Sequence, residues 1–393
     1  MTSGRGTTNG EPSSFSVAVN LTWCTPGRVG GSEQYLVRQL AGLGSQTSDA
    51  DGAPPQVTVH LSAALGAAQP SLGVHRCAVT RWPVERRAAR IIYEHGPLAW
   101  ATRHVDVVHH GGGTAPLWGP QPRVVTVHDL QYLHHPEYFS STRRRYLHAM
   151  MPQSVRRAAV VCVPTAHVAA EVCAEFGIDR DRVHVVPHGV AAPSIDATQI
   201  DEIRTRVGAH TRPMLVYPAI THPHKGHLLL LTALSQLDDD VVLVLCGGEG
   251  PAEADVRAAI DRGGFGDRVV RTGRVSDADR DALIAGADAL VFPSEHEGFG
   301  APLIEAMSMG TPAVVADIPA LREVSANGTA ARVVPADPAA WANAIGDVLS
   351  TPDPWITAGR DRARAYTLAA SGRALLSAYR AAVGHHAPDG VPR

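Results

Sequence analysis

Residues 288–312 read D-A-L-V-F-P-S-E-H-E-G-F-G-A-P-L-I-E-A-M-S-M-G-T-P, and this stretch constrains the fold more than any other. Its apolar start has the length of a buried strand and ends at a proline. After the glycine turn, Pro302 suits the first position of a helix, where its missing N–H costs nothing. Gly310 suits the left-handed residue that closes a helix, and the next proline stops it. The stretch therefore predicts a strand, a tight turn and a helix of about two turns.

The glycine turn of this stretch is suited to bind an anion. Gly298 and Gly300 stand where the backbone bends sharply and approaches a ligand. The first N–H groups of a helix lack partners within the helix and attract negative charge. Glu297 lies in the turn and Glu305 lies eight residues later, so one carboxylate faces the expected pocket and the other reaches hydroxyls beside the helix start. A turn without a ligand is the plain alternative, because the helix dipole alone favours glutamates there.

Short apolar runs alternate with helical segments along the whole chain, which predicts doubly wound parallel sheets covered by helices on both faces. With 393 residues the chain is too long for one core, so we expect an α/β protein with two Rossmann-like domains facing a central cleft. The expected parts are a disordered tail at 1–14, a first domain at 15–205, a second domain at 206–354, a helix crossing back at 355–383 and a disordered tail at 384–393.

Composition narrows the functional classes. The formal net charge of −3 argues against nucleic acid as a partner. The five cysteines form no close pair, so a reducing compartment is expected rather than a disulfide framework. No apolar run reaches the ~18 residues of a membrane span, and residues 1–14 lack an apolar signal core. We therefore expect a cytoplasmic protein.

Lys225 is the single lysine among 35 Lys plus Arg residues. It follows the apolar run 214–218 and directly precedes an apolar helix, a place that favours a phosphate group. A compact ammonium suits such a site better than a guanidinium does. His222, His224 and His227 surround it, but without carboxylate partners they are expected to be solvated or to face phosphate. No metal ligand is assigned.

Three other loops follow predicted strands, at the sheet edge where ligands bind in open parallel sheets. They follow the runs 15–21, 123–127 and 268–272, and they contain Gly30, Gly31, His128, Arg274 and Val275. A separate arginine-rich segment at 81–90 is either a solvated helix face or a basic face that rests on the inner surface of a membrane.

The stretch from Glu297 to Pro312 closely resembles the donor-binding signature E-G-F-G-L-P-x-L-E-A-M-A-x-G-x-P of family-4 retaining glycosyltransferases of the GT-B fold. The segment V-x-V-H-D around His128 is similar to that family's T-x-H-D. The segment V-H-V-V-P-H-G-V at 183–190 is similar to V-I-P-N-G-V, with His188 in place of the usual Asn. The loop P-H-K-G-H and the segment 128–139 resemble bacterial mannosyltransferases.

The resemblance implies a metal-independent retaining glycosyltransferase without a cofactor, whose cosubstrate is a nucleotide sugar. Lys225 and the backbone near Phe299 and Gly300 would neutralise the departing diphosphate. Glu305 would accept from ribose hydroxyls, Glu297 would bind the sugar, and His128 would lie near the reaction centre. In the same family, the glycine pair at 30–31 meets the diphosphate or the acceptor, and the loop of Arg274 and Val275 lies beneath the base.

One cation of the family pattern near Lys225 is absent from this sequence. The family usually carries an Arg five or six residues before it, where this chain has Ala219 and Ile220. His224, Arg28 or Arg274 are the candidates to replace that cation.

GDP-mannose is the first expectation for the donor, followed by UDP- and dTDP-sugars. A polysaccharide, a lipid-linked glycan or a small molecule remains open as acceptor. A catalytically silent sugar-nucleotide-binding protein is the non-enzyme alternative. A sugar phosphorylase would need a pyridoxal-phosphate lysine deep in the second domain, and a nucleotide-sugar epimerase is the last alternative.

Overall fold

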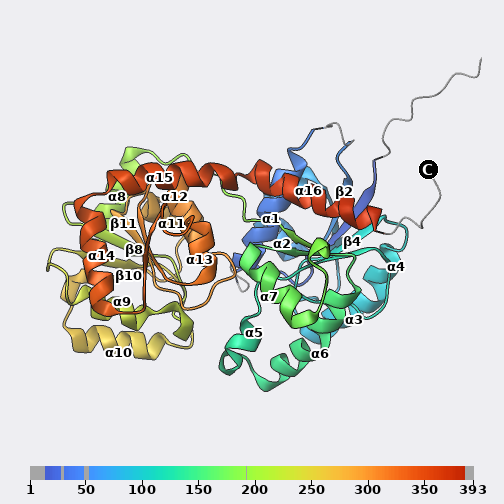
Figure 1. Ribbon diagram of the computed structural model, residues 1–393, viewed down its shortest axis with the longest axis horizontal. Coiled ribbons are helices and arrows are strands. Elements are labelled where there is room, and N and C mark those ends of the chain that lie inside the picture. Colours follow the sequence, from blue (N-terminus) through green and yellow to red (C-terminus); the bar gives the residue numbers. More distant parts are fainter. Residues whose placement is uncertain (1–13, 28–30, 48–52, 192, 386–393) are drawn as a thin grey trace, which may run out of the picture. The chain divides into compact units, whose positions relative to one another are not determined.

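The computed structural model describes residues 14–27, 31–47, 53–191 and 193–385 (Figure 1). Its internal contacts divide the chain into two units. The first unit consists of Met1–Pro164, Ala169–Gly189 and Leu368–Arg393, and the second of Thr165–Val168 and Val190–Thr367. Residues 190–205, which the sequence analysis placed in the first domain, lie in the second unit. The reason is that Val190 and Ile203 are both buried in the core of that unit.

The first unit contains a seven-stranded parallel sheet in the order β3-β2-β1-β4-β5-β6-β7. Its strands are β1 (Ser16–Asn20), β2 (Gln56–Ser62), β3 (Arg76–Thr80), β4 (Val107–His110), β5 (Arg123–Thr126), β6 (Val160–Val163) and β7 (Val183–Val185). Its longer helices are α1 (Gly31–Gly44), α2 (Ala63–Ala68), α3 (Arg87–Tyr93), α6 (Ser141–Arg157), α7 (Ala166–Phe176) and α16 (Leu368–Gly384), of which α7 begins in the second unit. The valine-rich strands β4, β5 and β6 are buried along their whole length, as expected for strands covered on both faces.

The strand order reverses between β1 and β4. Strand β1 pairs with β2 on one side and with β4 on the other, and Val17 is opposite Val57 and Val107 in the two registers. The chain winds outward through β2 and β3 first and only then returns to place β4 beside β1. The loops after these two strands therefore leave in opposite directions, which opens a crevice at their carboxyl ends.

The second unit contains a six-stranded parallel sheet in the order β10-β9-β8-β11-β12-β13. Its strands are β8 (Met214–Tyr217), β9 (Val242–Leu245), β10 (Val269–Arg271), β11 (Ala289–Phe292), β12 (Ala313–Ala316) and β13 (Arg332–Val334). Its helices are α8 (Ala197–Arg206), α9 (His227–Leu234), α10 (Glu253–Gly263), α11 (Asp277–Ala285), α12 (Ala301–Met309), α13 (Pro319–Val324), α14 (Pro338–Ser350) and α15 (Asp353–Ala363). The switch point of this sheet lies between β8 and β11, and the two strands pair directly.

The C-terminal segment differs from the single helix expected at 355–383. It forms α15 in the second unit, a short 3-10 turn at Arg364–Tyr366, and α16 in the first unit. Figure 1 shows α16, near the red end of the chain, beside the blue helix α1. Gly42 and Gly372 let the two backbones approach closely, because a Cβ on Gly42 would lie 1.9 Å from the carbonyl oxygen of Leu368. Two doubly wound parallel-sheet units, as predicted, are confirmed.

Candidate functional site

An ion pair bridges the switch point of the second sheet. Lys225 ends a short 3-10 turn after β8, and Glu297 lies in the loop after β11. The Nζ atom of Lys225 lies 2.5 Å from Oε1 of Glu297. The two side chains retain 18% and 16% of their exposure, so both are largely withdrawn from water but still reachable. The two residues that the sequence singled out on separate grounds are therefore direct partners.

The two loops that carry this ion pair are locked together. The hydroxyl of Tyr217, at the end of β8, donates to the carbonyl of Lys225 at 2.7 Å and lies 3.1 Å from Oγ of Ser294. The N–H of Glu295 donates to the carbonyl of His224 at 2.8 Å. Gly226 is left-handed, with φ of 68°, and a Cβ there would lie 2.4 Å from the carbonyl oxygen of residue 293. Nothing in the sequence marked Tyr217 as a site residue, because a tyrosine at the end of an apolar run looks like a core residue.

Helix α12 begins and ends as its glycines predict. Gly300 has φ of 91°, and a Cβ there would lie 2.4 Å from Cδ2 of the buried Leu321. Gly310 closes the helix with φ of 85°. Pro302 is the second residue of the helix, one position later than expected, because Ala301 begins it. N–H groups in the first turn of a helix have no acceptor within the helix, so the missing N–H of proline costs no hydrogen bond at this second position either.

The remaining residues of the turn divide between core and site. Phe299 is 3% exposed and packs edge-on against Tyr366 with ring centroids 5.5 Å apart, so its side chain belongs to the core. The carbonyl of Gly298 accepts from Oγ1 of Thr165 at 3.0 Å. Glu305 is 8% exposed, and its charge helps to raise the pKa of Arg280 on α11. The carboxylate of Glu305, inside α12, is thus largely buried.

Arg274 and Val275 follow β10. Gly273, with φ of 66°, turns the chain so that the guanidinium of Arg274 reaches the loop after β9. Its Nη2 and Nε atoms lie 3.8 and 3.9 Å from where a Cβ of Gly248 would stand. Val275 packs against the core. Beside this loop lies a groove of about 510 Å³. It is lined by Glu249, Arg257, Ile260, Asp261, Arg271, Thr272 and Gly273.

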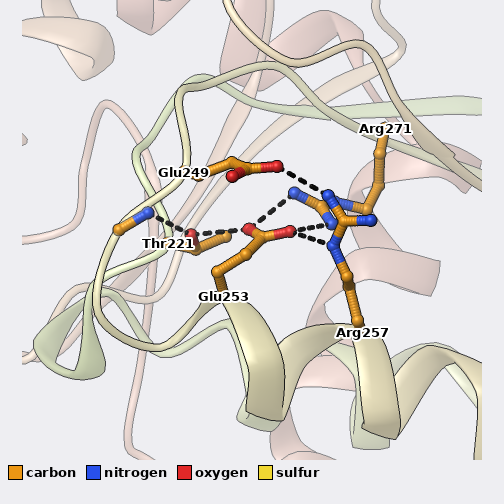
Figure 2. A network of polar contacts seen from close by, with 6 residues as sticks. Thr221, Glu249, Glu253, Arg257 and Arg271 are labelled. Carbon is orange, nitrogen blue, oxygen red and sulfur yellow. Dashed lines mark hydrogen bonds and ion pairs between the residues drawn. The ribbon is translucent and has the colours of Figure 1, made fainter.

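A polar network that was not predicted from the sequence joins the loop after β8, the segment between β9 and the start of α10, and the end of β10 (Figure 2). Glu253, the first residue of α10, accepts hydrogen bonds from both Arg271 and Arg257, and from Oγ1 of Thr221 at 2.8 Å. Hydrogen bonding from Arg271 is the main reason that the pKa of Glu253 falls to about 2. Arg257 also reaches Glu249 at 2.6 Å. The network holds the loop before Lys225, because Thr221 belongs to that loop.

His128 lies in the first unit, just after β5. It is part-buried, and its Nε2 lies 2.9 Å from the carbonyl of Gly111. The ring packs near Trp23 and edge-on against Tyr35, with centroids 5.9 and 5.3 Å apart. Burial lowers its pKa, so the imidazole is neutral near pH 7. The next residue, Asp129, accepts from the N–H of Gln131 and shapes the turn.

The other candidate site residues of the first unit are the glycine loop before α1 and His188. Gly31 is exposed and begins α1, and a Cβ there would meet nothing within 4 Å. Gly30 and Arg28 lie outside the described residues. His188, at the place of the family's Asn, is buried against Tyr35 with ring centroids 4.5 Å apart. Burial holds its pKa well below the ordinary value.

The histidines around Lys225 are more buried than the sequence suggested. His224 and His227 are 7% and 3% exposed, so they are not solvated. Burial, aided by the charge of Lys225, lowers the pKa of His227 to about 4. Within the described ranges, no group of three or more His, Cys, Asp or Glu side chains could hold a metal ion.

In the same part of the chain, no helix is both long enough and apolar enough to cross a membrane.

Two family models match the chain in succession. The model described as Glycosyltransferase Family 4 matches residues 29–192, and the model described as Glycosyl transferases group 1 matches residues 199–366. Together the two matches cover every strand of the two sheets except β1, which precedes residue 29.

Individual curated proteins match this chain at modest sequence identity. An O-antigen chain mannosyltransferase of Salmonella typhimurium is 30% identical over 251 residues, which are 63% of this chain and 65% of that protein. A D-inositol 3-phosphate glycosyltransferase of Xylanimonas cellulosilytica is 33% identical over 215 residues, 50% of each chain. The matches thus span about half to two thirds of the length of these curated relatives.

A solved structure shows the same fold over nearly the whole chain. The crystal structure of HepE from Anabaena in complex with UDP and glucose matches with a TM-score of 0.74 at 19% identity. The match covers 92% of this chain and 98% of that chain. With both family models matched, and with the E-x7-E turn and the lysine loop meeting at one switch point, the chain belongs to the family-4 glycosyltransferases of the GT-B fold.

Proposed function

We propose that this protein transfers a sugar from a nucleoside diphosphate donor to a hydroxyl group of an acceptor. The observation that carries the proposal is the contact between Lys225 and Glu297 at the switch point of the second sheet. One cation and one carboxylate there match the two needs of such a donor, which are neutralisation of a diphosphate and acceptance of hydrogen bonds from sugar hydroxyls.

Charge balance explains why the two side chains are paired without a donor. An isolated charge at 16–18% exposure is costly, and each side chain offsets the other. A donor diphosphate brings negative charge to Lys225 and sugar hydroxyls to Glu297, so both side chains exchange one partner for another. The N–H groups at the start of α12 add positive potential beside the phosphates. The buried carboxylate of Glu305 accepts from the ribose hydroxyls.

The reaction we propose retains the anomeric configuration. The bond between the anomeric carbon and the phosphate oxygen breaks, the acceptor oxygen bonds to the same face, and its proton passes to the leaving phosphate. Lys225 stabilises the charge that develops on the diphosphate. Glu297 favours the positive charge that develops on the sugar ring, and neutral His128 orients the sugar. Each residue binds or orients, and no cofactor or metal ion is assigned a step.

GDP-mannose is the donor we propose first. The similarity to an O-antigen chain mannosyltransferase and the mannosyltransferase-like loop around Lys225 support it. The groove of about 510 Å³ is lined by Arg271, Thr272 and Gly273, which directly precede Arg274 in the chain, and we propose it as the place of the base. A glycan, a lipid-linked glycan or a small molecule supplies the acceptor hydroxyl.

We also propose a peripheral membrane contact on the first unit. Ile92, Trp100 and Trp118 keep 60%, 68% and 59% of their exposure, and the guanidinium of Arg103 lies 3.9 Å from the ring centroid of Trp100. Exposed tryptophans beside arginines suit an interface with anionic lipids. Co-sedimentation with phosphatidylglycerol vesicles is expected for the wild type and reduced for Trp100→Ser. Equal sedimentation with neutral phosphatidylcholine vesicles would contradict an electrostatic contribution.

The experiment that tests the donor proposal is calorimetric titration of the purified protein with GDP, UDP, dTDP and ADP, without added metal. We expect one diphosphate to bind at least tenfold more tightly than the others. Turnover of the matching nucleotide sugar, followed by mass spectrometry, then separates a transferase from a silent binding protein. The absence of binding to all four by a folded sample would refute the proposal.

A further inference from the structure

The loop between β8 and α9 carries Lys225, and the shape of this loop decides where the lysine ammonium lies. The loop ends in a 3-10 turn, Pro223–Lys225, which the left-handed Gly226 closes with φ of 68°. Lysine has a flexible four-carbon stem, so the side chain alone does not fix the position of its charge. Two buried residues, Tyr217 and Thr221, use their hydroxyl groups to hold the backbone from which this stem starts. The proposed reaction assigns neither hydroxyl a role.

Tyr217 holds the carbonyl of Lys225 from the end of β8. Its side chain is fully buried, and its ring centroid lies 4.9 Å from that of His227 and 6.0 Å from that of Phe292. The ring is therefore held in place, and its hydroxyl donates to the carbonyl of Lys225 at 2.7 Å. The same hydroxyl oxygen lies 3.1 Å from Oγ of Ser294, which is also buried. One hydroxyl group thus joins the lysine loop to the loop after β11.

Thr221 lies in the middle of the lysine loop, and each of its polar groups has a partner. Its N–H donates to the carbonyl of Gly248 at 3.2 Å, and its carbonyl accepts from the N–H of Ala252 at 3.0 Å. Its hydroxyl donates to the carboxylate of Glu253 at 2.8 Å (Figure 2). The same hydroxyl accepts from the N–H of Gly250 at 2.8 Å. The middle of the loop is therefore fixed to the segment that leads into α10.

The carboxylate that accepts from Thr221 is itself held and ionised. Hydrogen bonds from Arg271 first, and from Arg257 second, lower the pKa of Glu253 to about 2. The carboxylate is therefore charged throughout the neutral pH range. A charged acceptor makes a stronger hydrogen bond than a neutral one does. The contact with Thr221 thus persists wherever the protein is assayed near neutral pH.

Backbone contacts on two sides leave the lysine loop little room for another shape. A Cβ on Gly247, in the loop after β9, would lie 1.9 Å from the carbonyl oxygen of Ala219. On the other side, a Cβ on Gly226 would lie 2.4 Å from the carbonyl oxygen of Pro293, which follows β11. Glycines therefore let both neighbouring loops lie directly against the lysine loop. The hydroxyl contacts and this packing act on the same segment.

We infer that the hydroxyls of Tyr217 and Thr221 are positioning groups for Lys225, which hold its loop in the donor-binding shape before a donor arrives. Neither hydroxyl needs to touch the donor. A preformed loop avoids the cost of ordering on binding, which lowers affinity by about 2- to 10-fold for each side chain that must be ordered. The inference rests on the proposed donor binding and identifies residues outside the donor contacts that control it.

The test variants Tyr217→Phe and Thr221→Val each remove one hydroxyl and nearly keep the shape of the side chain. The matched controls Tyr379→Phe and Thr311→Val remove hydroxyls of equally buried residues, whose hydrogen bonds of 2.8 and 2.7 Å lie outside the lysine loop. Calorimetry with GDP, UDP, dTDP and ADP measures diphosphate affinity. We expect each test variant to bind the preferred diphosphate about 3- to 10-fold more weakly than wild type. The controls should lose stability but bind as wild type does.

Double variants show whether the two hydroxyls act through the lysine. In the Lys225→Ala background, Tyr217→Phe and Thr221→Val should change diphosphate affinity less than about twofold, because the group that they position is gone. Losses that add in full to that of Lys225→Ala would overturn the inference, since the hydroxyls would then act without the lysine.

The order of the loop without a donor can be measured independently of any activity. Because the chain has a single lysine, ¹⁵N-lysine labelling gives one backbone amide signal, from the N–H that donates to the carbonyl of His222 at 2.9 Å. We expect this amide to exchange with solvent about tenfold faster in Tyr217→Phe than in wild type or Tyr379→Phe. Equal exchange rates in all three would overturn the inference.

Thr221→Val provides both measurements if Tyr217→Phe does not fold, because it leaves Glu253 paired with both arginines. Diphosphate affinity that is unchanged in both test variants would overturn this inference alone. A folded wild type that binds none of the four nucleotides would refute the donor proposal and this inference with it.

Discussion

Replacing Lys225 by alanine separates its role in stability from its role in donor binding. The substitution removes an ammonium 2.5 Å from the carboxylate of Glu297 and leaves that carboxylate unpaired at 16% exposure. Breaking a fully buried pair in this way costs about 3–5 kcal/mol. Because both side chains still reach water, we expect a smaller loss of about 1–3 kcal/mol in the free energy of unfolding.

The loss in donor binding has a different origin. A hydrogen bond to a charged group contributes about 1.5–3 kcal/mol, so nucleoside diphosphate affinity should fall by about 10- to 150-fold in Lys225→Ala. Lys225→Arg keeps the charge and should lose less. The double variant Lys225→Ala/Glu297→Gln removes the unpaired charge, so it should recover most of the stability but none of the affinity.

Chemical denaturation and isothermal calorimetry measure the two quantities on the same samples. Arg262→Ala, which removes an exposed cation from α10, is the control and should change neither. Equal diphosphate affinity in wild type, Lys225→Ala and Lys225→Arg would refute the assignment of Lys225 to the phosphates. Recovery of affinity in the double variant would show that the single variant acted only by disturbing the loop.

Three further predictions follow from the second unit. Glu297→Gln should lower turnover at least tenfold while diphosphate affinity stays nearly unchanged, because the carboxylate faces the sugar; unchanged turnover in a donor-saturated assay would remove it from the site. Gly300→Ala should lose about 2–5 kcal/mol of stability, since φ is 91° and the new Cβ would lie 2.4 Å from Leu321. Gly346→Ala is the matched control, because Gly346 lies inside α14 and a Cβ there would meet nothing within 4 Å; this variant should gain about 0.5–1 kcal/mol of stability. Equal changes in stability for the two glycine variants in denaturant melts would contradict the role of Gly300. The pKa of Glu253 is lowered to about 2 from an ordinary value of 4.5, so its contribution to stability is present above pH 4.5 and is lost as the pH falls toward 2. Glu253→Gln should therefore flatten the acid unfolding curve over this range, and an unchanged curve would show that the Arg271 contact contributes nothing.

Local signals predicted the second unit well. The strand and helix around the glycine turn follow from an apolar run, a proline and Gly310, all of which act within a few residues. The same is true of Lys225, whose place before a helix is visible in the sequence. Its contact with Glu297, 72 positions away, was not predicted from the sequence.

Contacts between distant positions were not predictable. Glu94 meets Asn20 across 74 positions, and nothing in the sequence near Glu94 marks it. The Thr221–Glu253–Arg271 network joins three loops whose proximity depends on the strand order β10-β9-β8. The break between α15 and α16 was missed because the residues there are ordinary helix formers, and the helix ends where the chain returns to the first unit. Tertiary packing overrides local propensity at such points.

The central claim is that Lys225 contacts the donor diphosphate, and the chain offers a direct test because it contains a single lysine. Protein grown with ¹³Cε-labelled lysine should give one side-chain NMR resonance. We predict that this resonance shifts saturably on addition of the preferred nucleoside diphosphate, with the affinity found by calorimetry, and that the nucleoside alone shifts it much less. A resonance that stays in place while calorimetry records diphosphate binding would contradict the account.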